Sequence, residues 1–274
     1  MKANLKKLAA ILALSATIFS CQKEKNTIST TNNGISQDVV NQILAQGFSA
    51  DNARKVDGGY VVEGDIFLSE EALKQPNIGP VLRVADEEQY HTTNLITGLP
   101  RTITVSCTGL SNIFVVATDT AVARYNALNL RIRFQRVASG ANVRIVGADL
   151  GGGGILGQSA GFPTTGGNPP SPITLNSHPG AFGSNPTVQF LGSIIAHEIG
   201  HTIGFRHTDF KNRAFSCGGI RVNEGQAGVG AILIPGTPSK PNADPTSWML
   251  ACIGLNGNRP FNANDMVALN FLYK

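Results

Sequence analysis

The chain has 274 residues, of which 42% are hydrophobic and 15% are charged, and its formal net charge is +4. Three lysines within the first seven residues supply most of that excess, so the remainder is close to neutral and gives no case for nucleic-acid binding. The 31 glycines and the low charge content are typical of a globular protein with polar, glycine-bearing surface loops.

Residues 1–20 have the features of an export signal, with a basic start followed by an apolar run over residues 8–19 that is too short to span a bilayer. The run ends in Phe-Ser-Cys, which resembles the lipobox of a bacterial lipoprotein. We therefore expect a lipid anchor on Cys21, a flexible tether over 21–34, and a location on the outer membrane or cell surface, with later release by processing left open. An ordinary secretory signal with an incidental cysteine is the alternative.

A small N-terminal region follows over residues 35–99 and contains an amphipathic unit over 35–75. Beyond it, period-two and helical patterns alternate up to the end of the chain. Strands are expected at 101–106, 130–134, 142–146 and 173–175, a glycine loop at 151–154, and helices at 118–129, 187–203 and 262–273.

Residues 197–207 have the pattern H-E-x-x-H-x-x-G-x-x-H. On a helix, His197 and His201 share one face and present both imidazoles to one point. Gly204 can adopt a positive φ, so the chain can turn there and return His207 as a third ligand. Glu198 lies beside such a metal rather than on it, where a general base for a bound water is needed. A histidine pair alone is weak evidence, whereas the extended pattern is specific for a catalytic metal site.

This motif resembles that of the metzincin zinc endopeptidases. The sequence HEIGHTIGFRHTD is similar to the corresponding stretch of the bacterial dual-action HEIGH metallopeptidases. The resemblance covers residues ~100–274 and adds a Met-turn, for which Met249 is the matching residue. It implies an α+β catalytic domain over 100–274, with a mixed twisted sheet, an active-site helix, the Met-turn and a C-terminal helix. Some metzincins have a tyrosine ligand two residues after that methionine; here the residue is Ala251, so no tyrosine switch is expected.

The glycine-rich segment 149–163 is similar to the matrixin loop that leads into the edge strand above the cleft. Ser159, Ala160 and Gly161 are therefore expected to form an unpaired edge that binds an extended substrate by ladder hydrogen bonds. A plain glycine-rich surface loop is the alternative.

Matrixins hold a second, structural zinc in this region through histidines. Gln158 stands where one of those ligands would fall, so we expect one catalytic zinc ion and no second one. Calcium on Asp149 and loop carbonyls stays open, because one carboxylate is too few ligands to decide it.

Three cysteines remain after Cys21. Because the segments that carry Cys217 and Cys252 both flank the metal site, a disulfide between these two is the preferred pairing. Cys107 is then expected to be a buried thiol in a strand.

The segment from Glu63 to Ile66 resembles the propeptide motif of astacin-like zymogens, in which an aspartate occupies the open metal position. Asp65 is therefore a candidate latency ligand, to be released by cleavage between about Pro76 and Arg101. A simple turn at Gly64-Asp65 is one alternative, and a cysteine switch through Cys107 is another.

Together these features predict a zinc metalloendopeptidase that hydrolyses proteins or peptides outside the cytoplasm, with zinc-bound water activated by Glu198. A monomer with no nucleic-acid partner is expected. The alternative is a surface-anchored binding protein that keeps the fold without turnover; the intact Glu198 disfavours it.

Overall fold

The structure is a computed structural model that describes residues 34–46, 48–74, 89–225, 229–238 and 243–274. The expected signal peptide, Cys21 and all but the last residue of the tether lie outside these ranges. None of the helices within the described ranges combines the length and apolar character needed to cross a bilayer.

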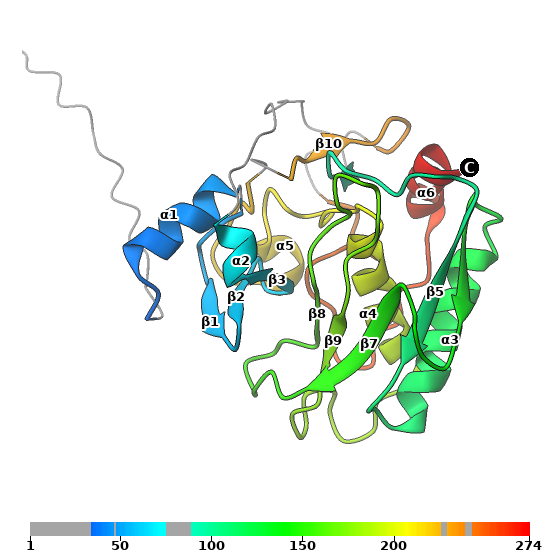
Figure 1. Cartoon of the computed structure of the whole chain (residues 1–274), viewed down its shortest axis with the longest axis horizontal. Helices are drawn as coiled ribbons and strands as arrows, with labels where there is room; N and C mark the ends of the chain where they lie inside the picture. Colours follow the sequence, from blue (N-terminus) through cyan, green and yellow to red (C-terminus); the bar gives the residue numbers. More distant parts are fainter. Residues whose placement is uncertain (1–33, 47, 75–88, 226–228, 239–242) are drawn as a thin grey trace, which may run out of the picture. The chain divides into compact units, whose positions relative to one another are not determined.

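The main sheet has the strand order β1-β2-β3-β8-β9-β7-β5-β6 and mixes parallel and antiparallel pairs (Figure 1). Its strands are β1 (Arg54–Val56), β2 (Gly59–Val62), β3 (Ile66–Ser69), β5 (Arg101–Cys107), β6 (Ile132–Arg136), β7 (Val143–Ala148), β8 (Gly157–Ser159) and β9 (Ile173–Asn176). A separate antiparallel pair joins β4 (Tyr90–His91) to β10 (Ile232–Leu233). The strands expected from alternation at 101–106, 130–134, 142–146 and 173–175 correspond to β5, β6, β7 and β9, with small shifts at the ends.

The helices are α1 (Gln37–Ala45), α2 (Glu70–Leu73), α3 (Asn112–Asn126), α4 (Val188–Thr202), α5 (Ala214–Cys217) and α6 (Ala263–Tyr273). The expectation of a helix at 118–129 is wrong at both ends, because α3 starts after Ser111 and ends three residues earlier. The β-branched and aromatic run 113–116 hid the first turn, since such residues have low helix propensity. In α3 that turn nevertheless packs against the core through Ile113 and Phe114.

Helix α4 is held by α3 on one side. The Tyr125 hydroxyl donates to the carbonyl oxygen of Ala196 at 2.8 Å, inside the helix turn that precedes His197. A Cβ on Gly192 would lie 3.2 Å from Thr120 and 3.3 Å from the Ala117 carbonyl oxygen, so a glycine lets the two helices approach closely. Both helices pack into one apolar core with β5, β6, β7 and β9. The metal-motif helix is therefore a rigid part of the main core.

The N-terminal region extends the same sheet. Strand β3 pairs in parallel with β8 at Ile66 and Ser159, and the Ser159 amide donates to the Asp65 carbonyl oxygen at 2.9 Å. The expectation that Ser159, Ala160 and Gly161 form a free edge is therefore wrong for the described chain, because β3 already covers that edge. Of the three residues only Ser159 lies in β8, and Gly161 adopts a φ of +103° that ends the extended backbone.

The C-terminal helix is tied to the segment of the expected Met-turn. Asn262 and Asp265 form a capping box at the start of α6. The buried Asp265 carboxylate also accepts from the Ser247 hydroxyl at 2.9 Å and from the Trp248 amide at 3.2 Å. Burial raises the pKa of Asp265 to about 6, although several hydrogen bonds favour its charged form. The turn before Met249 is thus fixed in place from the end of the chain.

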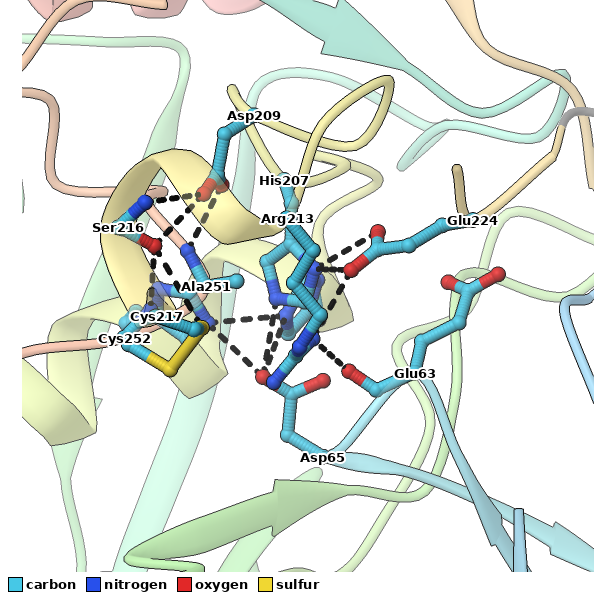
Figure 2. The surroundings of a disulfide bond; sticks show 12 residues. Glu63, Asp65, His207, Asp209, Arg213, Ser216, Cys217, Glu224, Ala251 and Cys252 are labelled. Atoms are coloured by element: carbon cyan, nitrogen blue, oxygen red, sulfur yellow. Dashed lines mark hydrogen bonds and ion pairs between the residues drawn. A yellow bond between two sulfur atoms is a disulfide. The ribbon is translucent and has the colours of Figure 1, made fainter. Parts of the chain in front are cut away.

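Cys217 and Cys252 form a disulfide, the pairing favoured by the sequence, which closes a loop with a sequence separation of 35 (Figure 2). It joins α5 to the segment that follows Met249. Because this link crosses between two segments beside the histidines, it restrains both of them.

Replacing Cys217 and Cys252 together with Ser should lower the free energy of unfolding by ~3–4 kcal/mol, since the unfolded chain regains the entropy of an open loop. Urea unfolding at neutral pH is the measurement. Cys107→Ala, which leaves the disulfide intact, is the matched control and should lose about 1 kcal/mol or less. Non-reducing peptide mapping that found Cys217 and Cys252 both as free thiols would refute the pairing.

Candidate metal centre

Three imidazoles meet at the end of α4. His197 and His201 lie one turn apart, and their Nε2 atoms are 3.1 Å from each other. Gly204 has a φ of +101°, as expected for the turn after the helix, and there a Cβ would also come within 2.7 Å of Leu95. The turn brings the His207 ring to a centroid distance of 4.8 Å from His201 and 5.2 Å from His197. The spacing of the motif thus places all three rings around one point.

The outer nitrogen of each ring faces an oxygen acceptor. His197 Nδ1 lies 3.0 Å from the Trp248 carbonyl oxygen, and His201 Nδ1 lies 2.8 Å from the Phe205 carbonyl oxygen. His207 Nδ1 lies 2.8 Å and 2.9 Å from the two carboxylate oxygens of Glu224. We therefore assign the hydrogen to Nδ1 in every ring, which leaves three Nε2 lone pairs directed inward.

Asp65 adds a fourth inward-facing atom. Its Oδ2 lies 2.9 Å from His207 Nε2, 3.4 Å from His197 Nε2 and 3.8 Å from His201 Nε2. Burial opposes ionisation of this carboxyl. Without a cation, the charge of a doubly protonated His207 and hydrogen bonds from the histidines outweigh burial, so the pKa of Asp65 lies well below its ordinary value. A bound cation would take over that stabilising role.

This set of donors fits a metal cation. The ligand atoms of Asp65, His197, His201 and His207 lie within 4.8 Å of one another, and all four side chains are buried. With the Nδ1 atoms protonated, the site contains three Nε2 acceptors and one carboxylate oxygen, and none of these four atoms carries a hydrogen to donate to another. A cation satisfies such a set without water. Imidazole nitrogens with one carboxylate oxygen are ligands that Zn²⁺ accepts in tetrahedral sites.

Glu198 lies next to this group but is not one of its members. Its side chain is buried, and its Oε2 has no hydrogen-bond partner within the described residues. Burial, and then the charge of Asp65, raise the pKa of Glu198 well above its ordinary value. On the other side β8 approaches closely, since a Cβ on Gly157 would lie 2.9 Å from Glu198 Oε1. The carboxyl is free to act on a molecule that enters the site.

Met249 lies beneath the histidine helix, as the Met-turn resemblance implies. It is fully buried, and a Cβ added to Gly200 would be 2.5 Å from its sulfur and 2.5 Å from the Trp248 ring. Gly200 therefore leaves the space into which Met249 and Trp248 pack. The same turn offers the Trp248 carbonyl to His197.

Glu224 is a functional residue that the sequence analysis missed. It is fully buried, it contacts His207, and its Oε1 accepts from the Arg213 guanidinium at 2.9 Å (Figure 2). Burial opposes its ionisation, but His207 and Arg213 outweigh that effect, so the pKa of Glu224 is lowered. It lies in an irregular segment with no periodicity, and no pattern in the residues after Cys217 points to it.

The turn that carries Asp65 is held by two arginines. Arg206 Nη2 pairs with Glu63 Oε2 at 3.0 Å, and both side chains are buried. Arg213 donates to the Glu63 carbonyl oxygen, and its guanidinium lies so close to Gly64 that a side chain there would collide with it (Figure 2). Burial raises the pKa of Glu63 to about 8, against the effect of Arg206. Loss of Glu63 or of Arg206 would leave the buried charge of the other without its partner.

The other residues considered from the sequence are not members of this group. Asp149 accepts from the Gly151 amide at 2.8 Å and is 2.9 Å from His178 Nδ1, so the carboxylate considered for calcium is engaged with a histidine. Cys107 is half-buried at the end of β5, and burial raises the pKa of its thiol. Gln158 lies in β8.

Comparisons with known proteins agree with this chemistry. A family model described as "Dual-action HEIGH metallo-peptidase" matches residues 60–273. Two solved structures of myroilysin match with 18% and 19% identity and TM-scores of 0.33 and 0.31. They cover 43% and 42% of this chain and 54% and 48% of the other chain, so this chain spans about half of myroilysin. No curated protein matches.

The family match runs from β2 to the last residue of α6 and contains all four members of the buried His/Asp group. It spans well over half of the chain. The chain belongs to the dual-action HEIGH metallopeptidase family.

Proposed function

We propose that the chain is a zinc endopeptidase whose catalytic base is Glu198. The observation that supports this most strongly is the convergence of three Nε2 lone pairs in a buried site, with an unpartnered carboxyl beside them. A structural metal site would have no use for such a carboxyl. The polypeptide substrates follow from membership of a peptidase family.

In this proposal His197, His201 and His207 hold the metal, and Glu198 handles the proton. When bound, zinc supplies Lewis acidity that lowers the pKa of water and polarises the scissile carbonyl. Glu198 accepts the proton of the attacking water and returns it to the leaving nitrogen. The buried position of Glu198 and its raised pKa suit a group that must both take and give a proton.

We further propose that residues 35–99 are propeptide-like and keep the enzyme latent through Asp65. Strand β3 pairs with β8 beside the metal site, and Asp65 Oδ2 contacts all three histidines. The Glu63–Arg206 ion pair adds a second attachment. Cleavage between about Pro76, which lies outside the described residues, and Arg101 would separate this region from the metal site.

The cellular setting is also part of the proposal. The basic and apolar start of the sequence and its lipobox-like ending at Cys21 support export and lipid anchoring. The disulfide between Cys217 and Cys252 suits an oxidising compartment outside the cytoplasm. A monomer that acts on proteins or peptides, and not on nucleic acid, is consistent with the near-neutral charge.

Glu198→Gln should keep one zinc ion per chain but lose turnover of processed protein by at least about 100-fold, because the amide cannot accept a proton. His207→Ala should instead lose the metal, since it removes a ligand. The measurements are zinc content by elemental analysis and hydrolysis of casein with and without a chelator. Near wild-type cleavage by Glu198→Gln would exclude Glu198 as the base. Metal binding without any cleavage by the processed wild type would favour the non-catalytic binding protein.

Glu224→Gln should weaken zinc affinity by roughly 10- to 100-fold, because the amide holds His207 less firmly and leaves Arg213 short of a charge partner. Zinc affinity by chelator competition is the readout, with thermal unfolding to correct for loss of folded protein. Glu71→Gln, on an exposed face of α2, is the control and should bind zinc like the wild type. Unchanged affinity in Glu224→Gln would show that Glu224 does not support His207.

Asp65→Ala should make the intact chain active without processing, because the carboxylate that competes with water for the metal is then gone. Intact wild type should be nearly inert under the same conditions. Hydrolysis of a quenched peptide library by freshly purified, intact protein tests this, with gel electrophoresis to confirm that no cleavage has occurred. Equal activity of the intact Asp65→Ala and wild-type proteins would reject latency through Asp65.

A further inference from the structure

A cavity of about 440 Å³ opens beside Glu198. Helix α4 forms one wall with Ser193 and Ile194, and the segment after Met249 forms another with Leu250 and Ile253. These walls are mostly apolar, and they belong to rigid elements: α4 lies in the main core and the segment after Met249 is fixed by the disulfide. The cavity thus has the form of a side-chain pocket.

Arg259 adds a positive charge to this pocket. Its backbone is fixed on both sides, since its amide donates to the Ser193 hydroxyl at 2.9 Å and its carbonyl accepts from Arg124 at 3.3 Å. Within the described part of the chain, however, its guanidinium makes no hydrogen bond and no ion pair. Burial lowers the pKa of Arg259, which reflects the partial loss of water around its charge.

The two carboxylates whose charge acts on Arg259 are already committed elsewhere. Asp209 accepts from the Ser216 hydroxyl at 2.6 Å and from the Ala251 amide at 3.0 Å. Asp265 accepts from Ser247 and Trp248. Both acids act on Arg259 only through their charge, at distances beyond an ion pair. A ligand side chain that brought a carboxylate into the pocket could therefore form an ion pair with the partly desolvated guanidinium of Arg259.

The other two cations of the cavity do not offer this. Arg213 is paired with Glu224 at 2.9 Å. Arg54 lies in β1, in the N-terminal region whose removal is part of the proposed activation. Arg259 is therefore the unpaired guanidinium that stays with the metal site.

We propose that Arg259 makes this cavity a subsite for an acidic side chain of the substrate, at the residue that carries the leaving nitrogen. The inference rests on the proposed function, in which Glu198 returns a proton to that nitrogen. Because Glu198 lines this cavity and is the group that returns the proton to the leaving nitrogen, the side chain next to that nitrogen is the one expected to enter it. Cleavage on the amino side of Asp or Glu follows.

Equilibrium binding tests this without any need for turnover. The full chain with Arg54→Gln, Asp65→Ala and Glu198→Gln, loaded with zinc, is titrated by calorimetry with peptides that differ only in Glu against Gln, or Asp against Asn. The Arg54→Gln change removes the other cation of the cavity, whose Nε and Nη2 atoms lack hydrogen-bond partners within the described residues. The acidic member of each pair should bind roughly 10- to 100-fold more tightly, as for a hydrogen bond to a charged group. Adding Arg259→Gln should abolish the difference, and Arg259→Lys should keep part of it. Arg133→Gln, on the exposed face of β6, should leave it unchanged.

Equal affinities within each pair, no binding of any peptide, or an acidic preference that survives Arg259→Gln would each overturn the assignment. A cleavage map of the processed wild type separates this inference from the proposed function. Cleavage with no acidic preference would sink the Arg259 subsite and leave the peptidase standing. Absence of all cleavage would sink the peptidase, while the binding comparison would still decide whether Arg259 recognises carboxylates.

Discussion

Three imidazole lone pairs and a carboxylate oxygen face one another in a buried space, and the rest of the structure is arranged around that constraint. Each ring is oriented from outside by a different part of the chain: His197 by the Met-turn carbonyl, His201 by the backbone just after α4, and His207 by Glu224. Because each outer nitrogen has its own acceptor, no inner nitrogen can obtain a proton by tautomer exchange without losing a hydrogen bond. A bound cation would satisfy all four inward-facing atoms at once.

The surrounding charges are balanced in a way that couples the N-terminal turn to the metal site. Glu63 and Glu224 are opposed by Arg206 and Arg213, and Glu224 is shared with His207. A buried charge network of this kind is strongly destabilised when one member is removed. Departure of the turn would withdraw Glu63 from Arg206, leaving Glu224 as the acidic partner that already lies 3.9 Å away. The network can therefore accept both states of the turn.

Much of the metal centre could be predicted from local spacing. The positions of His197 and His201 follow from helix geometry, and the turn at Gly204 follows from the steric freedom of glycine. The helix expected at 262–273 from its helical pattern is α6 (Ala263–Tyr273). Such features depend on a few neighbouring residues, and sequence shows them directly.

The features that could not be predicted from the sequence depend on contacts between residues far apart in the chain. Glu224 reaches His207 from an irregular loop, and the pairing of β3 with β8 joins residues about a hundred positions apart, with Ile66 opposite Ser159. Helix α3 starts in a run of residues with low helix propensity, which packing against the core overrides. Tertiary contact determines each of these features, and no periodic pattern along the chain encodes it.

X-ray absorption spectroscopy of the intact, full-length protein tests the metal centre most directly, together with zinc analysis of the same sample. One zinc per chain, bound by three imidazole nitrogens and one carboxylate oxygen, is the expected result, and Asp65→Ala should retain the nitrogens and lose the carboxylate. A chain that takes up no zinc, or a zinc whose ligands do not change in Asp65→Ala, would contradict a three-histidine centre closed by Asp65.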